Sequence, residues 1–304
     1  LIEGAIVNNS FFDSNTVCRV SADLINNSYF YKNDNSASAD MYSTYPNRGI
    51  VTANEIYCSV FIGNKALYGG ALADTKTVYY SVFLNNSATY GGNDIFVYDG
   101  EVDYSSNWWG SNQKPDNNRI FVHIGSLTLD NWVIMSLDAV TNTHIVVALN
   151  KLTDNSGNIY EFNSTLPTRT VYFSSDYGII APLNTSLENN KADAYVVQNE
   201  TTADFNIYAR IDNQLLDLTL RNNNTQLVMD DVVFYGNNNN YEITLINVNG
   251  HKIFNQTLTV VITTPKGEKE YFTLVTDEKG HAKFEVTYPV GVYNISVYYD
   301  GNGY

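Results

Sequence analysis

The sequence contains few charged residues, only six prolines and only two cysteines. Charged side chains make up 16% of the 304 residues, and no apolar run is long enough to cross a bilayer as a helix. Alanine is scarce, and long stretches of the helix formers Leu, Glu and Lys are missing. Cys18 and Cys58 are too few for a four-cysteine metal site, and the sequence leaves open whether they pair. These absences argue against a helical bundle, a helical membrane span and a thiolate zinc centre.

The chain is acidic, with 17 basic and 32 acidic side chains and a net charge of −15. No basic stripe interrupts the acidic surface, so nucleic-acid binding through phosphate neutralisation is not expected. The composition is 44% hydrophobic and 13% aromatic, with 41 Asn and 24 Tyr, which is enough apolar surface for a folded core. An all-β fold suits this composition best.

A repeat of the form Ser-x-Phe-x-x-Asn occurs four times in the first third of the chain. Its serines are residues 10, 28, 59 and 81, so the steps are 18, 31 and 22 residues. Stacked coils of a parallel β-helix lie about 4.8 Å apart, which would align one Phe and one Asn per coil into internal ladders. The predicted ladder residues are Phe12, Phe30, Phe61 and Phe83, and Asn15, Asn33, Asn64 and Asn86.

A second motif, Tyr-Gly-Gly, follows the third and fourth repeats. Gly69 and Gly70 recur as Gly91 and Gly92, again 22 residues further on, and predict tight corners. The longer 31-residue step predicts an insertion over residues 35–47. Exposed loops of this kind concentrate binding contacts, so the candidate ligand-binding residues are Tyr42, Tyr45 and Arg48.

An Asn-Trp-Trp-Gly-Ser-Asn segment occupies residues 107–112, after the last repeat. A β-helix ends in an open core and an unpaired strand edge, so bulky side chains are needed there. Trp108 and Trp109 are predicted to plug that end, and a sugar-stacking platform is the alternative.

The pattern changes after Leu127, where short alternating strands recur with turn signals between them. Phe205, Ile207, Ala209 and Ile211 alternate with polar residues, as expected for a half-buried strand. The predicted organisation is a parallel β-helix over 1–125, an Ig-like β-sandwich over 126–224 and a second over 225–304. We expect the first part to be the C-terminal coils of a longer repeat array.

These motifs, in this order, resemble a known family. The Phe-x-x-Asn and Gly-Gly-Ala-Leu repeats resemble those of polymorphic outer-membrane proteins. The closing Asn107–Asn112 segment and the later β modules resemble adhesin-like surface proteins of methanogenic archaea. The resemblance implies a right-handed β-helix, Ig-like modules and an extracellular place on the cell surface. It departs from the family at Gly4-Ala5, which lacks one glycine, and after Asn33, where no Gly-Gly pair follows.

Catalytic and metal motifs are missing from the sequence. The four His are not in zinc spacing, and no nucleophile elbow, P-loop or dinucleotide fingerprint occurs. No cofactor is expected, and calcium is the metal that the oxygen ligands would favour, although no calcium-loop motif is present. One acid-dense stretch, Asp94, Asp99, Glu101 and Asp103, leaves a carboxylate pair for glycan cleavage as an alternative.

The sequence therefore predicts a non-enzymatic cell-surface adhesin that attaches to another cell through a glycan or protein ligand. Its Ig-like modules would be spacers, and neither nucleic acid nor a membrane span is expected. The alternatives are a polysaccharide lyase or hydrolase with accessory modules, and an envelope protein that only has a structural role.

Overall fold

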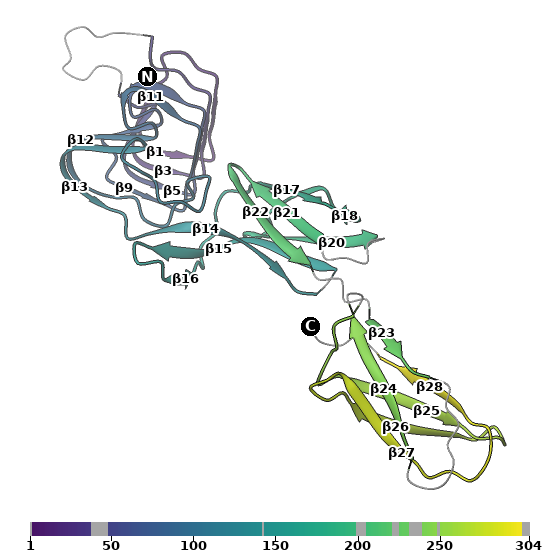
Figure 1. The fold of residues 1–304 in the computed structure, drawn as a ribbon. Coiled ribbons are helices and arrows are strands. Elements are labelled where there is room, and N and C mark those ends of the chain that lie inside the picture. Colours follow the sequence, from purple (N-terminus) through teal and green to yellow (C-terminus); the bar gives the residue numbers. More distant parts are fainter. Residues whose placement is uncertain are drawn as a thin grey trace. The chain divides into compact units, whose positions relative to one another are not determined.

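The computed structural model confirms the predicted all-β fold. Throughout the described residues the chain forms strands joined by turns, and these parts contain no helix (Figure 1). Contacts group the chain into two compact units, of which the first takes in Leu1–Ser175, Ile179–Val197 and Ile207–Leu218. The three-domain division stays a prediction. The structure describes residues 2–37, 48–141, 143–198, 205–220, 225–230, 239–247 and 250–299.

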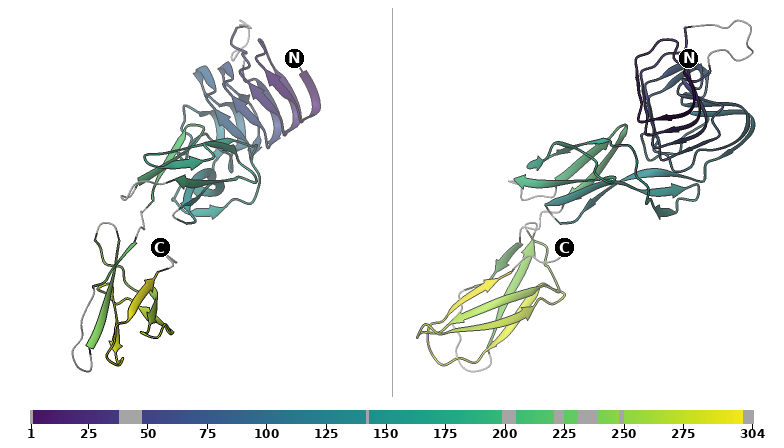
Figure 2. Two further views of the ribbon diagram at one scale, coloured as in Figure 1. Left: turned by 90° about the vertical axis from the view of Figure 1, so that its right-hand side faces the viewer. Right: turned by 180° about the vertical axis from the view of Figure 1, so that it is seen from behind.

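Strands β1 to β13, which we call the parallel region, form three sheets in which every pairing is parallel. Within a sheet, successive strands lie side by side, as Figure 2 shows. The first sheet contains β1 (Ile2–Asn8), β3 (Val20–Asn26), β5 (Val51–Tyr57), β8 (Leu72–Ala73), β12 (Ile95–Asp103) and β13 (Ile120–Thr128), with β9 (Thr77–Tyr79) beside β5 and β12. The second contains β2 (Phe11–Asp13), β4 (Tyr29–Tyr31), β6 (Val60–Ile62) and β10 (Val82–Leu84), and the third β7 (Lys65–Tyr68) and β11 (Ser87–Gly91).

A stack of aromatic rings runs through the core of the parallel region. Neighbouring rings are stacked with nearly parallel planes, and their centroids are 4.7 to 5.1 Å apart. This separation is close to the spacing of paired strands, because the four phenylalanines belong to successive strands of one sheet. The stack consists of Phe12, Phe30, Phe61, Phe83 and finally Trp109.

A ladder of side-chain amides lies beside the aromatic stack. The Nδ2 groups of Asn15, Asn33 and Asn64 each donate to the Oδ1 of the next Asn, at 2.8, 3.1 and 3.0 Å. The same Oδ1 atoms accept the backbone N–H of the preceding Asn. These bonds span 18, 31 and 22 residues, the spacing of the sequence repeat. Asn33 and Asn64 are fully buried, and their polar groups are satisfied only while the strands keep this register.

The Gly-Gly corners are offset by one residue between the two copies of the motif. Gly91 lies opposite Tyr68, because the register shifts between Ala88 and Gly91. Positive φ therefore occurs at Gly69 and Gly92, at +60° and +66°. A Cβ at either position would approach a backbone oxygen to about 2 Å, so only glycine fits.

Strands β14 to β22, the middle region, form two antiparallel sheets. One contains β14 (Asn131–Ala139), β15 (His144–Asp154), β16 (Ile159–Glu161), β18 (Ile179–Ala181) and β20 (Lys191–Gln198); the other contains β17 (Thr170–Ser175), β19 (Asn184–Ser186), β21 (Phe205–Ile211) and β22 (Gln214–Leu220).

Strands β23 to β28, the C-terminal region, form two three-stranded antiparallel sheets around one core. Ile243 and Leu245 from one sheet are buried with Leu258, Val260 and Ile262 from the other. The first sheet contains β23 (Thr225–Val228), β24 (Asn239–Asn247) and β27 (His281–Val286); the second contains β25 (Thr257–Thr263), β26 (Lys269–Val275) and β28 (Asn294–Tyr298).

The turn between β15 and β16 is held by one carboxylate. Asp154 Oδ1 accepts the N–H groups of Ser156 and Asn158 at 2.8 and 2.9 Å, and Oδ2 accepts Asn158 Nδ2 and the Tyr160 hydroxyl at 2.8 Å. All four donors stabilise the charged form. The hydrogen bonds from Asn158 and Tyr160 lower the pKa of Asp154 to about 2.

We predict that loss of the Asn64 amide destabilises the parallel region. Asn64→Ala removes the acceptor of Asn33 and the donor to Phe30 O, which leaves buried polar groups without partners. The expected loss is about 3 kcal/mol in the free energy of unfolding, measured by urea titration with tryptophan fluorescence. Asn15→Ala, at the exposed end of the ladder, should cost about 1 kcal/mol or less. Equal losses in the two variants would contradict a continuous ladder.

We predict that the Asp154 carboxyl titrates near pH 2 in the folded protein, because its charged form accepts four hydrogen bonds. Its depressed pKa stabilises the fold above the ordinary value of 3.8, and this contribution disappears as the pH falls toward 2. NMR titration of the carboxyl carbon measures the midpoint. Tyr160→Phe removes one donor and should raise it, and an unchanged midpoint would show that this bond does not matter.

Candidate functional site

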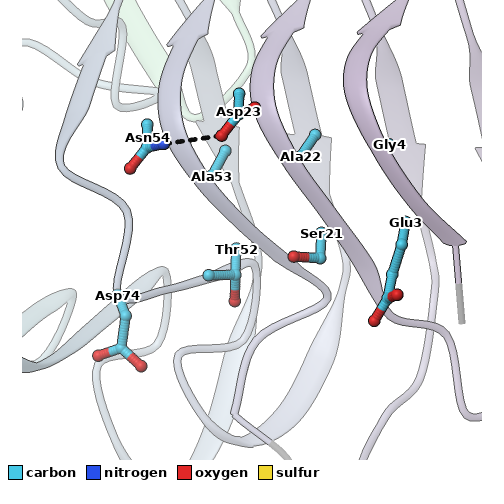
Figure 3. Close-up of a pocket in the computed structure, with 9 residues that line it drawn as sticks. All are labelled: Glu3, Gly4, Ser21, Ala22, Asp23, Thr52, Ala53, Asn54 and Asp74. Atoms are coloured by element: carbon cyan, nitrogen blue, oxygen red, sulfur yellow. Dashed lines mark hydrogen bonds between the residues drawn. The ribbon is translucent and has the colours of Figure 1, made fainter.

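The outer face of the first sheet carries a hollow lined by polar side chains. Adjacent strands place Glu3, Ser21 and Thr52 opposite one another in the parallel register. Two residues further along β3 and β5, Asn54 donates its amide to Asp23 at 3.0 Å. The hollow has a volume of about 380 Å³. Figure 3 shows the residues that line it. We call it the polar hollow and define it by Glu3, Ser21, Asp23, Thr52, Asn54 and Asp74, over a floor of Gly4, Ala22 and Ala53.

Arg48 borders the polar hollow and fixes one of its carboxylates. Its guanidinium lies 2.7 Å from Asp74 Oδ2, and both side chains are 29% exposed. The other oxygen of Asp74 accepts the backbone N–H of Tyr98 at 2.8 Å. Arg48 also lies over the Tyr98 ring at 5.8 Å, and that ring stacks on His123. Asp74 is therefore held in one position at the edge of the hollow.

The other two candidate ligand residues, Tyr42 and Tyr45, lie outside the described residues. Of the predicted set, the structure therefore places Arg48 alone, and it places Arg48 beside a hollow made by residues that the sequence reasoning did not select. A sequence signal for their positions exists, because Glu3, Ser21 and Thr52 stand at the 18- and 31-residue steps of the main repeat, although their side chains differ.

Two of the four acids in the acid-dense stretch, Asp94 just before β12 and Asp103 at its end, are bonded to other side chains of the protein. Asp94 is buried. Its carboxylate accepts hydrogen bonds from Arg119 Nε at 2.6 Å and from the Asn86 amide at 2.9 Å, so it continues the amide ladder. Burial raises the pKa of Asp94, while Arg119 and Asn86 oppose that rise. Asp103 accepts the Tyr79 hydroxyl at 2.5 Å. Burial and this bond raise the pKa of Tyr79.

The two tryptophans of the closing segment occupy different places. Trp109 is the last ring of the aromatic stack, 4.7 Å from Phe83, and the Arg119 guanidinium lies over the Trp109 ring, 5.4 Å from its centroid. Trp108 is also buried, and its Nε1 donates to Asp212 at 2.7 Å. Asp212 belongs to the turn between β21 and β22, so Trp108 joins the parallel region to the middle region.

Asp212 is the centre of that junction. Arg169 donates to both of its carboxylate oxygens, through Nε and Nη2, while Trp108 donates to Oδ2. The turn adds a backbone bond from Asn213 to Gly110 at 3.1 Å. All of these residues lie within the first compact unit. Bidentate pairing with Arg and a third donor satisfy a carboxylate that is only 5% exposed.

The two cysteines do not pair; Cys18 is buried and Cys58 half-buried. Burial raises the pKa of both thiols, which disfavours the reactive thiolate. Within the described part of the chain, no group of three or more His, Cys, Asp or Glu is arranged to hold a metal ion. A search of the same residues finds no helix that could span a membrane.

Comparison with known proteins leaves the family open. No family model matches the chain, and no curated protein matches it in sequence.

We predict that Asp212→Ala weakens the junction. The substitution leaves the mostly buried Arg169 guanidinium and the Trp108 indole without their acceptor. The expected loss is about 3 kcal/mol in the free energy of unfolding, with a shift in tryptophan emission as Trp108 loses its bond. Asp217→Ala, at an exposed position on β22, is the matched control and should change stability by less than about 0.5 kcal/mol. Equal effects of the two substitutions would show that the junction does not depend on Asp212.

Proposed function

We propose that this chain is part of a non-enzymatic cell-surface adhesin. In this proposal residues 1–125 form a short parallel β-helix that presents the binding surface, and the Ig-like modules 126–224 and 225–304 are spacers. The protein would be extracellular, and its partner would be a glycan or protein on another cell.

The observation that carries the proposal is a polar hollow on the outside of a regular stack of parallel strands. The inward positions of these strands are taken by aliphatic core residues such as Val20, Val51 and Leu72, which leaves the outward positions available for recognition. The resemblance to adhesin-like proteins of methanogenic archaea supports the same function through the order of the motifs, and the comparisons add nothing to it.

The rival proposal, a glycan-cleaving enzyme, has less support. It needs two carboxylates across a groove, one of them protonated. Of the acid-dense stretch, Asp94 is bonded inside the protein to Arg119, and Asp103 accepts a tyrosine hydroxyl. The polar hollow also contains carboxylates, which a glycan-cleaving enzyme would need. The experiment below therefore includes an assay for cleavage.

We predict that the intact chain of 304 residues, immobilised on beads, selectively retains a subset of microbial or host cells. The control beads carry an unrelated protein of similar net charge. A chelator arm tests whether calcium contributes, and a reducing-end assay on polysaccharides tests for cleavage. Failure to retain any cell type while the chain is folded would count against the adhesin. Release of reducing ends would favour the enzyme.

A further inference from the structure

We propose that the polar hollow is the ligand site of the adhesin, and that it binds a neutral, hydroxyl-rich glycan rather than an acidic one. This inference rests on the proposed function and adds the place and the chemical class of the ligand.

The strand register repeats the polar groups at regular intervals. Glu3, Ser21 and Thr52 lie on successive strands of one sheet, so neighbouring members are separated by about 4.8 Å. Asp23 and Asn54 form a second row two residues along the strands (Figure 3). A sugar unit in an extended chain advances by a similar distance. The hollow therefore offers one set of polar groups per strand to a chain of sugars lying across the strands.

The hydrogen-bonding inventory fits hydroxyl groups. Three carboxylates, Glu3, Asp23 and Asp74, only accept hydrogen bonds, whereas Ser21 and Thr52 can donate and accept. A set that is rich in acceptors suits a ligand with many O–H donors. Sugar hydroxyls also accept hydrogen bonds, so the hydroxyls of Ser21 and Thr52 can act as donors or as acceptors toward them.

The charge of the hollow excludes acidic glycans. The described residues that line it include three acids and no base. Arg48 stands at its border, but its charge is directed to Asp74 at 2.7 Å. A uronate or another acidic sugar would meet carboxylates without a free cation, in a protein of net charge −15.

Part of the hollow is already ordered without ligand. Asp23 and Asn54 are joined by a hydrogen bond, and Asp74 is held by Arg48 and by the N–H of Tyr98. The strands beneath are fixed by the parallel register. Ordering these side chains in advance lowers the entropic cost of binding.

The main test fills the hollow without touching its charges. Ser21→Trp places a large side chain in the hollow, and Ser126→Trp makes the same change at an exposed position on β13, outside it. The probes are neutral oligomers of N-acetylglucosamine, glucose, mannose, galactose and xylose, the acidic oligogalacturonate and the cationic glucosamine oligomer. Binding to the intact chain is measured by glycan array and calorimetry.

We expect at least one neutral oligomer to bind, and Ser21→Trp to weaken it at least tenfold while Ser126→Trp leaves it unchanged. Oligogalacturonate should not bind. Binding of a neutral oligomer that Ser21→Trp does not reduce would place the site elsewhere. Preference for the acidic oligomer, or binding of the cationic oligomer alone, would overturn the ligand class.

A second variant covers the case in which Ser21→Trp does not fold, as judged by circular dichroism. Thr52→Val keeps the shape of the side chain and removes its hydroxyl, so binding should weaken about threefold. Unchanged binding in a folded Thr52→Val variant would then overturn the site.

Cell retention separates this inference from the proposed function. If cells are retained equally by wild type and Ser21→Trp, the adhesin stands and the hollow is not its site. If a neutral glycan binds in the hollow but no cells are retained, the site stands and adhesion fails. If neither cells nor neutral glycans bind to the folded chain, both proposals fail.

Discussion

The structure of the parallel region depends on the ladder of buried asparagine side chains. Each buried Asn accepts the backbone and side-chain N–H groups of one neighbour and donates to the next. A shift of one residue between two strands would leave several buried polar groups unpaired, at a cost of about 1–3 kcal/mol each. The ladder therefore fixes the register even though the repeats are 18, 31 and 22 residues apart. Differences in repeat length can be accommodated only in the connections between strands.

Each series of repeated side chains needs a different partner where it ends. The structure supplies one for the asparagines, one for the phenylalanines and one for the serines. Asn86 donates to the Asp94 carboxylate instead of a further Asn, and Trp109 takes the place of a further Phe. Among the repeat serines, the backbone N–H of Ser59 donates to the hydroxyl of Ser81, whereas the backbone N–H of Ser81 donates to Asn107 Oδ1. Asp94 brings a charge into the interior, and Arg119 compensates it. Asn107 and Trp109 of the closing segment therefore stand where the repeat would place a serine hydroxyl and a phenylalanine ring.

The parts of this structure that sequence could predict are those with a period. The all-β fold follows from composition and alternation, and the Phe and Asn positions follow from four copies of one motif. The one-residue offset between the Gly-Gly corners could not be predicted, because both copies have the same sequence and the bulge near Gly91 is a local adjustment. The bond from Trp108 to Asp212 joins residues 104 apart with no repeat between them. The polar hollow was missed for another reason: its residues are outward positions, which differ from strand to strand.

That difference between inward and outward positions bears on function. In the first sheet, Val20, Val51 and Leu72 are buried at equivalent inward positions and are all aliphatic, because they pack into one core. At the next position outward, Glu3, Ser21 and Thr52 have different charge and size although their backbones are paired identically. No packing constraint selects among them, so exchanging one for another changes the chemistry of the surface and leaves the register intact. A stack of parallel strands held from within can therefore present a rigid surface whose polar groups can differ without disturbing the fold.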